Sequence, residues 1–412
     1  MLNRKETKYL ENLIEKYGKK NISAKNKYPL IRQPFITSDV IAGAEVLLSG
    51  KITMAEITES FEKNFAKYLG VKHALMVNSG SSANLLALFA LVNPKNKNKL
   101  KINDECVLPA LCWSTSLWPI VQSGLKPKFV DADINTFNIN LNDIEKKITK
   151  KTKAIMAVHI LGNCTNMSKL TAIAKTYNLD LIEDTCESLG SKYSGKFLGT
   201  FGKYGTYSFY ASHQISAGEG GMIVCNNFSD FEIIHRLRAH GWDRGLKNKD
   251  NNNFNFVNSG FNLRPLDLTA AIGFNQFKRL NKMNGIRTDN RRKIIDSIKN
   301  SAKFKKQLEF LEPIKNLKPS WFGLPILINK KLLKYKKKYL NYLNKNGIAT
   351  RPIISGNFVN QPSIKLYKLN QKNEKFKHAQ EIEERGFFIG LHTEKIKKEE
   401  IDLLKEKLLN IK

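Results

Sequence analysis

The sequence has no long apolar run, although 42% of its 412 residues are hydrophobic. A transmembrane helix needs about 20 consecutive, mostly apolar residues, so we expect none. The first 20 residues, MLNRKETKYLENLIEKYGKK, are charged, follow a helical pattern and lack the apolar core of a signal peptide. We therefore expect a cytoplasmic protein with no membrane partner.

Cysteine is scarce and scattered along the chain. The cysteines are odd in number, and no two of them form a CxC or CxxC pair. Such a set predicts neither a disulfide framework nor a zinc site, and we expect no metal. No cysteine follows position 225; the five are Cys106, Cys112, Cys164, Cys186 and Cys225.

Acidic residues are also few. The chain has 37 Asp and Glu against 68 Lys and Arg, which gives a net charge of +31. A charge of this size raises the question of a nucleic-acid partner. The lysines are spread over helices and turns, however, and no RNP-like motif, zinc finger or arginine-rich tail is present. We expect no nucleic-acid partner, because an anionic small substrate accounts for the charge equally well.

Short apolar runs alternate with helical patterns from about residue 40 to 285, which is typical of an α/β chain with a mostly parallel sheet. The runs are nearly continuous in apolar residues, so helices should cover both faces of the sheet. We predict a polar helical lead-in over 1–30, a large α/β domain over 31–285 and a small α+β domain over 286–412. The predicted strands of the large domain are 73–77, 106–110, 128–132, 154–160, 179–184, 205–210 and 221–226.

The segment VNSGSSANLLALFAL (77–91) reads as a strand, a turn of small residues and a helix. Gly80, Ser81 and Ser82 would place free backbone N–H groups at a helix N-terminus, where phosphate binds readily. An ordinary turn capped by serine explains the same residues. Both interpretations remain open at this point.

Carboxylates gather at the end of the predicted strand in LDLIEDTCESLG (179–190). Ligands of α/β sheets bind at this edge, and Glu183, Asp184 and Glu187 are costly there unless they meet a cation or a polar ligand. A helix start capped by an acidic residue is the alternative. Trp113 in LPALCWSTSLWPI (108–120) follows another strand end and is suited to stacking on a flat ring, although most tryptophans are core residues.

No lysine occurs between Lys203 and Lys247, a stretch that includes TYSFYASHQISAGEGG (206–221). His213 stands there between a strand and a Gly-Glu-Gly-Gly turn. A lone histidine is usually a satisfied core or surface residue, but the spacing of this one to the other motifs singles it out. The remaining six histidines are interpreted as structural: His73, His159, His235, His240, His378 and His392.

In order and spacing, these motifs resemble the DegT/DnrJ/EryC/StrS sugar-nucleotide aminotransferases, a family of fold type I pyridoxal-phosphate (PLP) enzymes. The resemblance extends from SGKITMAEITESFEKNFAKYLGVKHALMVNSG (49–80) to GFFIGLHTEKIKKEEIDLL (386–404) and covers most of the chain. It implies a fold type I PLP-dependent transferase that binds PLP or its amine form, pyridoxamine phosphate (PMP), and acts as a homodimer.

The resemblance also implies which residues hold the cofactor phosphate. Gly80 and Ser81 would bind it through their turn, and Ser208 of the YSF sequence would add its hydroxyl. Asn262 in SGFNLRPLDLTAAIG (259–273) would reach the cofactor of the neighbouring subunit.

Other residues are implied to contact the cofactor ring. Trp113 would stack on it, Asp184 would pair with the pyridine nitrogen, and Glu187 would lie near the ring hydroxyl. Asp184 would keep the ring protonated and able to accept electrons.

Two positions depart from most aminotransferases of this family. Glu187 stands where they have glutamine, and His213 stands where they have the Schiff-base lysine. The histidine resembles the branch of the family that removes a C3 hydroxyl to make 3,6-dideoxysugars. Some members of that branch carry an iron–sulfur cluster on cysteines beyond the histidine; this chain has none there, so it resembles the cluster-free, GDP-linked members and no cluster is expected. ATRPIISGNFVNQP (349–362) resembles their substrate region, with Arg351 and Asn357 as substrate contacts.

The histidine changes the chemistry that the resemblance implies. Histidine forms no stable imine with PLP, but its pKa near neutrality suits it to move protons. The leading hypothesis is a PMP-dependent 3-dehydratase of a nucleotide-linked 4-keto-6-deoxyhexose, most similar to GDP-linked ones, with L-glutamate as amino donor, in O-antigen biosynthesis. The alternatives are an aminotransferase-like enzyme making a 3-amino or 4-amino sugar, and a non-catalytic binding protein.

Overall fold

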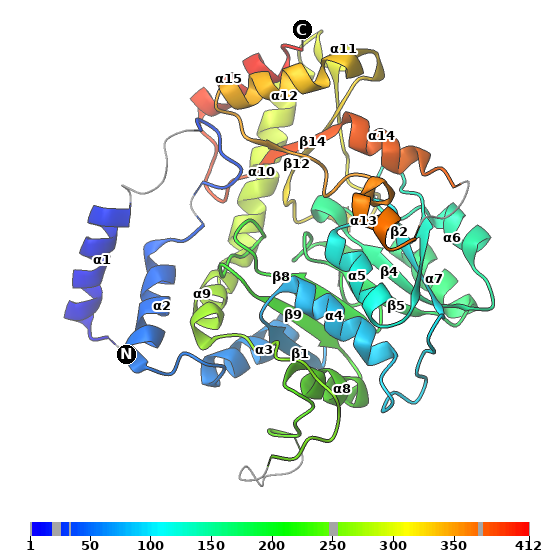
Figure 1. Cartoon of the computed structure of the whole chain (residues 1–412). Helices are drawn as coiled ribbons and strands as arrows, with labels where there is room; N and C mark the ends of the chain where they lie inside the picture. The colour runs from blue at the N-terminus through cyan, green and yellow to red at the C-terminus, as the bar shows by residue number, and fades with distance from the viewer. Residues whose placement is uncertain (1, 19–25, 33, 247–253, 370–373, 412) are drawn as a thin grey trace.

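The computed structural model describes residues 2–18, 26–32, 34–246, 254–369 and 374–411 (Figure 1). Its central feature is a seven-stranded sheet in the described part of the chain, with the order β1-β9-β8-β5-β4-β2-β3. The strands in that order are β1 (His73–Val77), β9 (Gly221–Cys225), β8 (Tyr204–Ser208), β5 (Asp180–Asp184), β4 (Thr152–Val158), β2 (Glu105–Pro109) and β3 (Lys126–Val130).

The sheet is mostly parallel, as the sequence predicts. β9 is antiparallel to both of its neighbours, β1 and β8, whereas β8, β5, β4, β2 and β3 run parallel. The connection from β8 to β9 spans residues 209–220 and contains no helix. Parallel strands need a longer crossover, usually with a helix, so β9 has to return antiparallel. His213 lies in this connection.

Helices cover both faces of the sheet, which explains the nearly continuous apolar strands. Adjacent residues of one strand enter different cores: Leu108 packs with α4 (Gly80–Leu91) and α5 (Ser114–Gln122), whereas Val107 packs on the side of α7 (Met167–Thr176). Side chains of a strand alternate between its faces. The predicted α/β class is therefore confirmed.

The C-terminal part forms a four-stranded sheet within the described residues, in the order β10-β12-β14-β13. Its members are β10 (Leu308–Phe310), β12 (Gly323–Ile328), β14 (Gly386–Gly390) and β13 (Thr350–Arg351), with α12 (Lys336–Lys345), α14 (Lys377–Arg385) and α15 (Lys398–Leu408) around it. β13 covers only two residues of the apolar run GIATRPI (347–353). Pro352 follows Arg351 and cannot donate to a strand ladder, so the pairing ends there.

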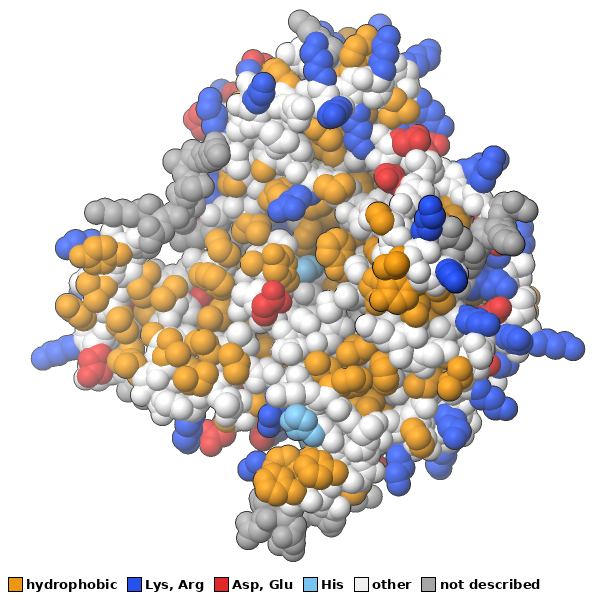
Figure 2. All heavy atoms as spheres, viewed as in Figure 1, with side chains coloured by type: hydrophobic (Ala, Val, Ile, Leu, Met, Phe, Trp, Pro, Cys, Tyr) orange, Lys and Arg blue, Asp and Glu red, His pale blue; other side chains and the backbone are white. Residues whose placement is uncertain are grey.

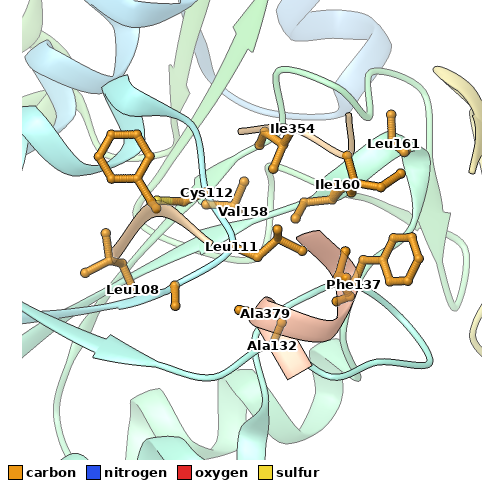
Figure 3. Close-up of a cluster of buried hydrophobic side chains, with 14 of the residues drawn as sticks. Leu108, Leu111, Cys112, Ala132, Phe137, Val158, Ile160, Leu161, Ile354 and Ala379 are labelled. Carbon is orange, nitrogen blue, oxygen red and sulfur yellow. The ribbon is translucent and has the colours of Figure 1, made fainter. Parts of the chain in front are cut away.

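The core continues from the large sheet into the C-terminal part (Figure 3). Ile354 and Ala379 of the C-terminal part lie among Leu108, Leu111 and Val158 from the ends of β2 and β4. The helix α10 (Leu280–Lys299) runs across residue 285, where the sequence places the domain boundary. The division into 31–285 and 286–412 stays a prediction.

The N-terminal segment contains α1 (Arg4–Gly18), which agrees with a helical pattern there, while residues 1 and 19–25 of the predicted lead-in fall outside the described residues. Next comes α2 (Thr37–Ser49), which packs against α9 (Asp267–Phe277). Within the described ranges, no helix combines the length and apolar character needed to cross a membrane.

Candidate active site

The turn between β1 and α4 leaves backbone donors free, as an anion site requires. Ser79 caps the helix, because its hydroxyl accepts the N–H of Ser82 at 3.1 Å and its carbonyl accepts the N–H of Ala83. The N–H groups of Gly80 and Ser81 have no acceptor among the described residues. The serine cap is thus present, and the role of this turn as a phosphate site stays a prediction.

Ser208 is brought to this turn by a close approach that only glycine permits. A Cβ atom at Gly80 would lie 2.6 Å from Cβ of Ser208 and 2.8 Å from Sγ of Cys186. Real Cβ atoms do not come this close, so any side chain at position 80 would push the end of β8 away. The Ser208 hydroxyl is consequently held beside the free N–H groups of α4, in a buried position.

Asp184 ends β5 in a buried pocket of donors. One carboxylate oxygen accepts from Nδ2 of Asn84 and from Oγ of Ser116, both at 2.8 Å. The other accepts the N–H of Cys186 at 3.2 Å. Thr206 fixes the Asn84 amide by donating to its oxygen at 2.6 Å. No cation pairs with Asp184 in the described chain, so this carboxylate is available to accept a hydrogen bond from a protonated ring nitrogen.

Glu183, the preceding residue, has a structural role. Its fully buried carboxylate lies 3.0 Å from Nε2 of His159. It also accepts the backbone N–H groups of Gly199, Phe201 and Gly202 at 2.6–2.8 Å. These donors satisfy the charge and hold the turn 199–202 against β5. Of the three carboxylates in this segment, Glu183 is therefore structural, whereas Asp184 and Glu187 lie at the candidate site.

Glu187 lies one turn beyond Asp184 and accepts the N–H of Leu161 at 2.9 Å. Burial, with a further contribution from the nearby Asp184, raises the pKa of Glu187 to about 7. At neutral pH this carboxyl group carries a proton part of the time. In that form it can donate a hydrogen bond as a glutamine would.

The raised pKa of Glu187 predicts a pH-dependent stability. The folded protein binds this proton up to about pH 7, whereas an unfolded chain loses it near pH 4.3. The folded state therefore loses stability as pH rises through that interval. In the absence of cofactor, the wild-type melting temperature should fall by a few degrees relative to Glu187→Gln between pH 5 and pH 8. Parallel melting curves for the two proteins would contradict this assignment.

Trp113 is 52% exposed at the residue that precedes α5. It is not a core residue, so the alternative that the sequence left open is wrong. Its indole stands at the end of β2, on the same edge of the sheet as Asp184. The role of Trp113 in stacking on a ring stays a prediction.

His213 follows β8 in the helix-free connection and lies beside the turn between β1 and α4. Its Nδ1 is 3.3 Å from Oγ of Ser208, and its backbone N–H donates to the carbonyl of Tyr210 at 2.9 Å. The imidazole packs 5.2 Å from the ring of Phe322. It also lines a cavity of about 210 Å³, whose walls include residues 30–32, residues 211–214, α10 and residues 391–394.

The surroundings of His213 favour its neutral form. Burial lowers the pKa of His213 to about 4; the positive charge of Arg287 adds to this effect, and Asp184 opposes it. An imidazole that is neutral at physiological pH can accept a proton. In the tautomer whose Nδ1–H donates to Oγ of Ser208, Nε2 is the nitrogen left to take it.

The three remaining predicted residues lie around this centre without a direct contact to it in the described chain. Asn357 is buried, donates to Oε1 of Gln380 at 3.2 Å and forms a bridge with Leu111, two residues before Trp113. Arg351 is exposed on β13. Asn262 is exposed, and the carbonyl of Leu263 accepts the N–H of Asn78 beside the β1–α4 turn.

Sequence reasoning missed several residues of the site. Asn84 stands four residues after Gly80, on the same face of α4, and Ser116 stands three residues after Trp113; helical spacing was a usable signal for both. Arg287 donates to the carbonyl of His213 at 3.2 Å. It belongs to the basic helix α10, where nothing in the sequence distinguishes it from the other cations.

Comparison with known proteins agrees with this geometry. The model of the DegT/DnrJ/EryC1/StrS aminotransferase family matches residues 35–408. The chain belongs to this family, and the predicted fold class, a fold type I PLP-dependent transferase, is confirmed. Among its relatives is the GDP-4-keto-6-deoxy-D-mannose 3-dehydratase of Escherichia coli O55:H7, which is 37% identical over 92% of this chain and 99% of the relative.

Solved structures give the same result. The E. coli GDP-4-keto-6-deoxy-D-mannose 3-dehydratase with bound hydrated PLP has a TM-score of 0.86 and 36% identity, over 93% of this chain and 99% of the other. A GDP-4-keto-6-deoxymannose 3-dehydratase with a trapped PLP–glutamate geminal diamine has the same TM-score and identity, over 93% of this chain and 100% of the other.

Proposed function

We propose that this chain is a PLP/PMP-dependent 3-dehydratase that removes the C3 hydroxyl of a GDP-linked 4-keto-6-deoxyhexose in the cytoplasm. The product would serve 3,6-dideoxysugar and O-antigen biosynthesis, with L-glutamate as amino donor. The observation that carries the proposal is a neutral His213, at the position where the aminotransferases of the family have lysine. It lies beside the turn between β1 and α4, which we call the phosphate turn because Gly80 and Ser81 would hold the cofactor phosphate there. The 37% identical relative, which this chain covers over 99% of its length and which is named as such a dehydratase, supports the substrate class.

The residues at the site fit the cofactor. The free N–H groups of Gly80 and Ser81, together with the Ser208 hydroxyl, form a cradle for phosphate at a helix N-terminus. Asp184 offers a carboxylate to a protonated pyridine nitrogen, and Trp113 offers an exposed ring for stacking. When bound, the amine form of the cofactor supplies a primary amine for the sugar ketone and a conjugated ring that accepts electrons.

His213 then moves the protons of the reaction. In its neutral form the imidazole accepts a proton at Nε2, and the negative charge of Asp184 stabilises the imidazolium that results. Burial and Arg287 disfavour that imidazolium, so it readily returns the proton to a leaving group such as the C3 hydroxyl. One side chain can therefore act first as general base and then as general acid.

A second candidate is the aminotransferase-like enzyme, and one observation favours it. Lys282 lines the same cavity as His213. It is the lysine among the described residues that line this cavity, so its primary amine is the candidate to replace the missing Schiff-base lysine. If Lys282 bonded covalently to the cofactor, the chain could complete a transamination.

The absence of a covalent link to PLP tests the two candidates against each other. We expect that borohydride treatment of the PLP-loaded protein, followed by mass spectrometry of the intact chain, leaves no pyridoxyl group on any lysine. The side chain of Lys282 is exposed and belongs to α10, whereas His213 is held against the phosphate turn. A stoichiometric adduct that peptide mapping places on Lys282 would support the aminotransferase instead.

We further propose a homodimer, with Asn262 reaching the partner's site. Hydrophobic side chains gather on the surface over α1 and α2 (Figure 2). On and beside α2, Val40, Leu47, Leu48 and Ile52 are 38–69% exposed. Exposed apolar patches are uncommon on monomers and mark interaction surfaces. Asn262, next to the β1–α4 turn, is exposed as a residue reaching across such an interface needs to be.

A further inference from the structure

The cavity beside His213 is lined by more positive charge than the described residues neutralise. Two of its basic side chains are paired: Arg32 with Glu400, and Arg279 with Asp39 at 2.9 Å. The acidic residue of the lining, Glu394, is 4.0 Å from Arg32 and half-exposed. The other basic side chains of the lining, Arg287 and Lys282, have no acidic partner in the described chain.

Of these two residues, Arg287 says more about the ligand of the cavity, because it is buried, with an exposed fraction of 7%. Nε donates to the carbonyl of Leu391 at 3.1 Å, and Nη2 donates to that of His213 at 3.2 Å. Nη1 is buried without an acceptor among the described residues. Burial lowers the pKa of Arg287 to about 10, which leaves it charged at neutral pH.

A buried guanidinium without a carboxylate is costly, and a donor left without an acceptor adds to that cost. An anion in the cavity offsets the cost of the unpaired charge. A carboxylate suits the guanidinium, which presents its donors in a planar fork. Lys282, five residues earlier on α10 and also in the lining of the cavity, can take a second negative group from the same molecule.

The size of the cavity indicates a small anion. Its volume of about 210 Å³ is below the roughly 300–1,000 Å³ typical of sites for drug-sized ligands, which favours a ligand smaller than a nucleoside diphosphate. The cofactor phosphate has its own cradle at the start of α4. A dicarboxylic amino acid is small, and its two carboxylates are the negative partners that Arg287 and Lys282 lack among the described residues.

We propose that Arg287 and Lys282 form a carboxylate-binding subsite for the amino donor, a dicarboxylic amino acid. The inference rests on the proposed function, because an enzyme that consumes the amine form of the cofactor needs an amino donor. Arg287 holds the backbone of His213, so a carboxylate bound to it lies next to the residue that moves protons. The sugar nucleotide then makes its own contacts elsewhere in the site.

Glutarate, which has two carboxylates and no amino group, is the probe for this subsite. We would titrate it into the PLP-loaded protein by calorimetry, in parallel with GDP and with inorganic phosphate. Arg287→Met should weaken glutarate binding roughly 10- to 100-fold, as expected for the loss of a hydrogen bond to a charged group. Lys282→Gln should weaken it about threefold, because an exposed charge contributes less.

Lys278→Gln is the matched control. Lys278 is an exposed lysine shortly before α10, lies outside the cavity lining and stacks over Phe274. Its replacement removes the same charge and should leave glutarate binding unchanged. Arg287→Lys, which keeps the charge but not the fork, should bind glutarate with intermediate affinity. If Arg287→Met fails to fold, the comparison of Lys282→Gln with Lys278→Gln decides, since both positions are exposed.

In steady state, the KM for glutamate should rise in Arg287→Lys and in Lys282→Gln while the KM for the sugar nucleotide stays the same. Equal glutarate affinity in all folded variants would overturn the subsite, and so would loss of GDP or phosphate binding in place of glutarate binding. The titration needs no turnover, so it is independent of which product the enzyme makes. A dehydrated product together with unchanged glutarate binding would remove the subsite and leave the proposed function intact.

Discussion

Replacing His213 with lysine should reduce dehydration by roughly two to four orders of magnitude, the usual contribution of a general acid–base residue. Lysine is mostly protonated at neutral pH, so it cannot accept a proton there, whereas the neutral imidazole can. It also lacks the ring that packs 5.2 Å from Phe322 and approaches Ser208. Its primary amine should form a covalent, borohydride-reducible link to PLP, visible as a new absorption band.

The link competes with the free amine cofactor that dehydration needs, and residual product should shift toward a 4-amino sugar. His213→Asn is the matched control, because it removes the base without adding an amine. It should lose dehydration to a similar extent and show neither the new band nor the amino sugar. Dehydration by His213→Lys at the parental rate would show that His213 does not carry the proton.

Asp184→Asn should lower turnover about a hundredfold or more, as expected when one preorganised electrostatic contact of a reaction centre is lost. The variant keeps the shape of the side chain, but a neutral amide no longer holds a protonated ring nitrogen. The NH₂ group of that amide would also face a hydrogen-bond donor in place of an acceptor, because Asn84, Ser116 and Cys186 all donate to Asp184. Cofactor affinity should change less than turnover, because the phosphate cradle is untouched.

Asp180→Asn controls for the loss of a charge on the same strand. Asp180 begins β5, at the other end from Asp184, and pairs with Lys203 at 3.4 Å. Its replacement should leave turnover unchanged. Thermal melting of both variants separates a catalytic defect from unfolding. Equal turnover of Asp184→Asn and the parent would show that this carboxylate does not contact the ring.

The strands of the large sheet were predictable because each is a short apolar run between turn signals. HALMV coincides with β1, and the other runs of the large sheet differ from the strands by one or two residues at their ends. The short hairpin of β6 (Lys192–Tyr193) and β7 (Lys196–Phe197), with β11 (Leu317–Lys318) beside it, was not predicted. Strands of two residues are too short to show alternation in a sequence.

The centre of the site was predictable wherever a residue sits in a local motif. Gly80, Ser208 and His213 lie in strand-to-turn segments that the sequence shows directly, and the fold brings them together. Arg287 was not predictable, because its contact with His213 joins residues 74 positions apart. Burial also changes the chemistry of Glu187 and His213, and a sequence does not show burial of this kind.

The identity of the product tests the central claim most directly. The protein would be incubated with GDP-4-keto-6-deoxymannose, PLP and glutamate, and the sugar nucleotide formed would be analysed by NMR. The account predicts a product in which C3 carries no oxygen and C4 is a ketone or its hydrate, with glutamate consumed. A GDP sugar that keeps its C3 hydroxyl and carries an amino group at C4 would contradict it.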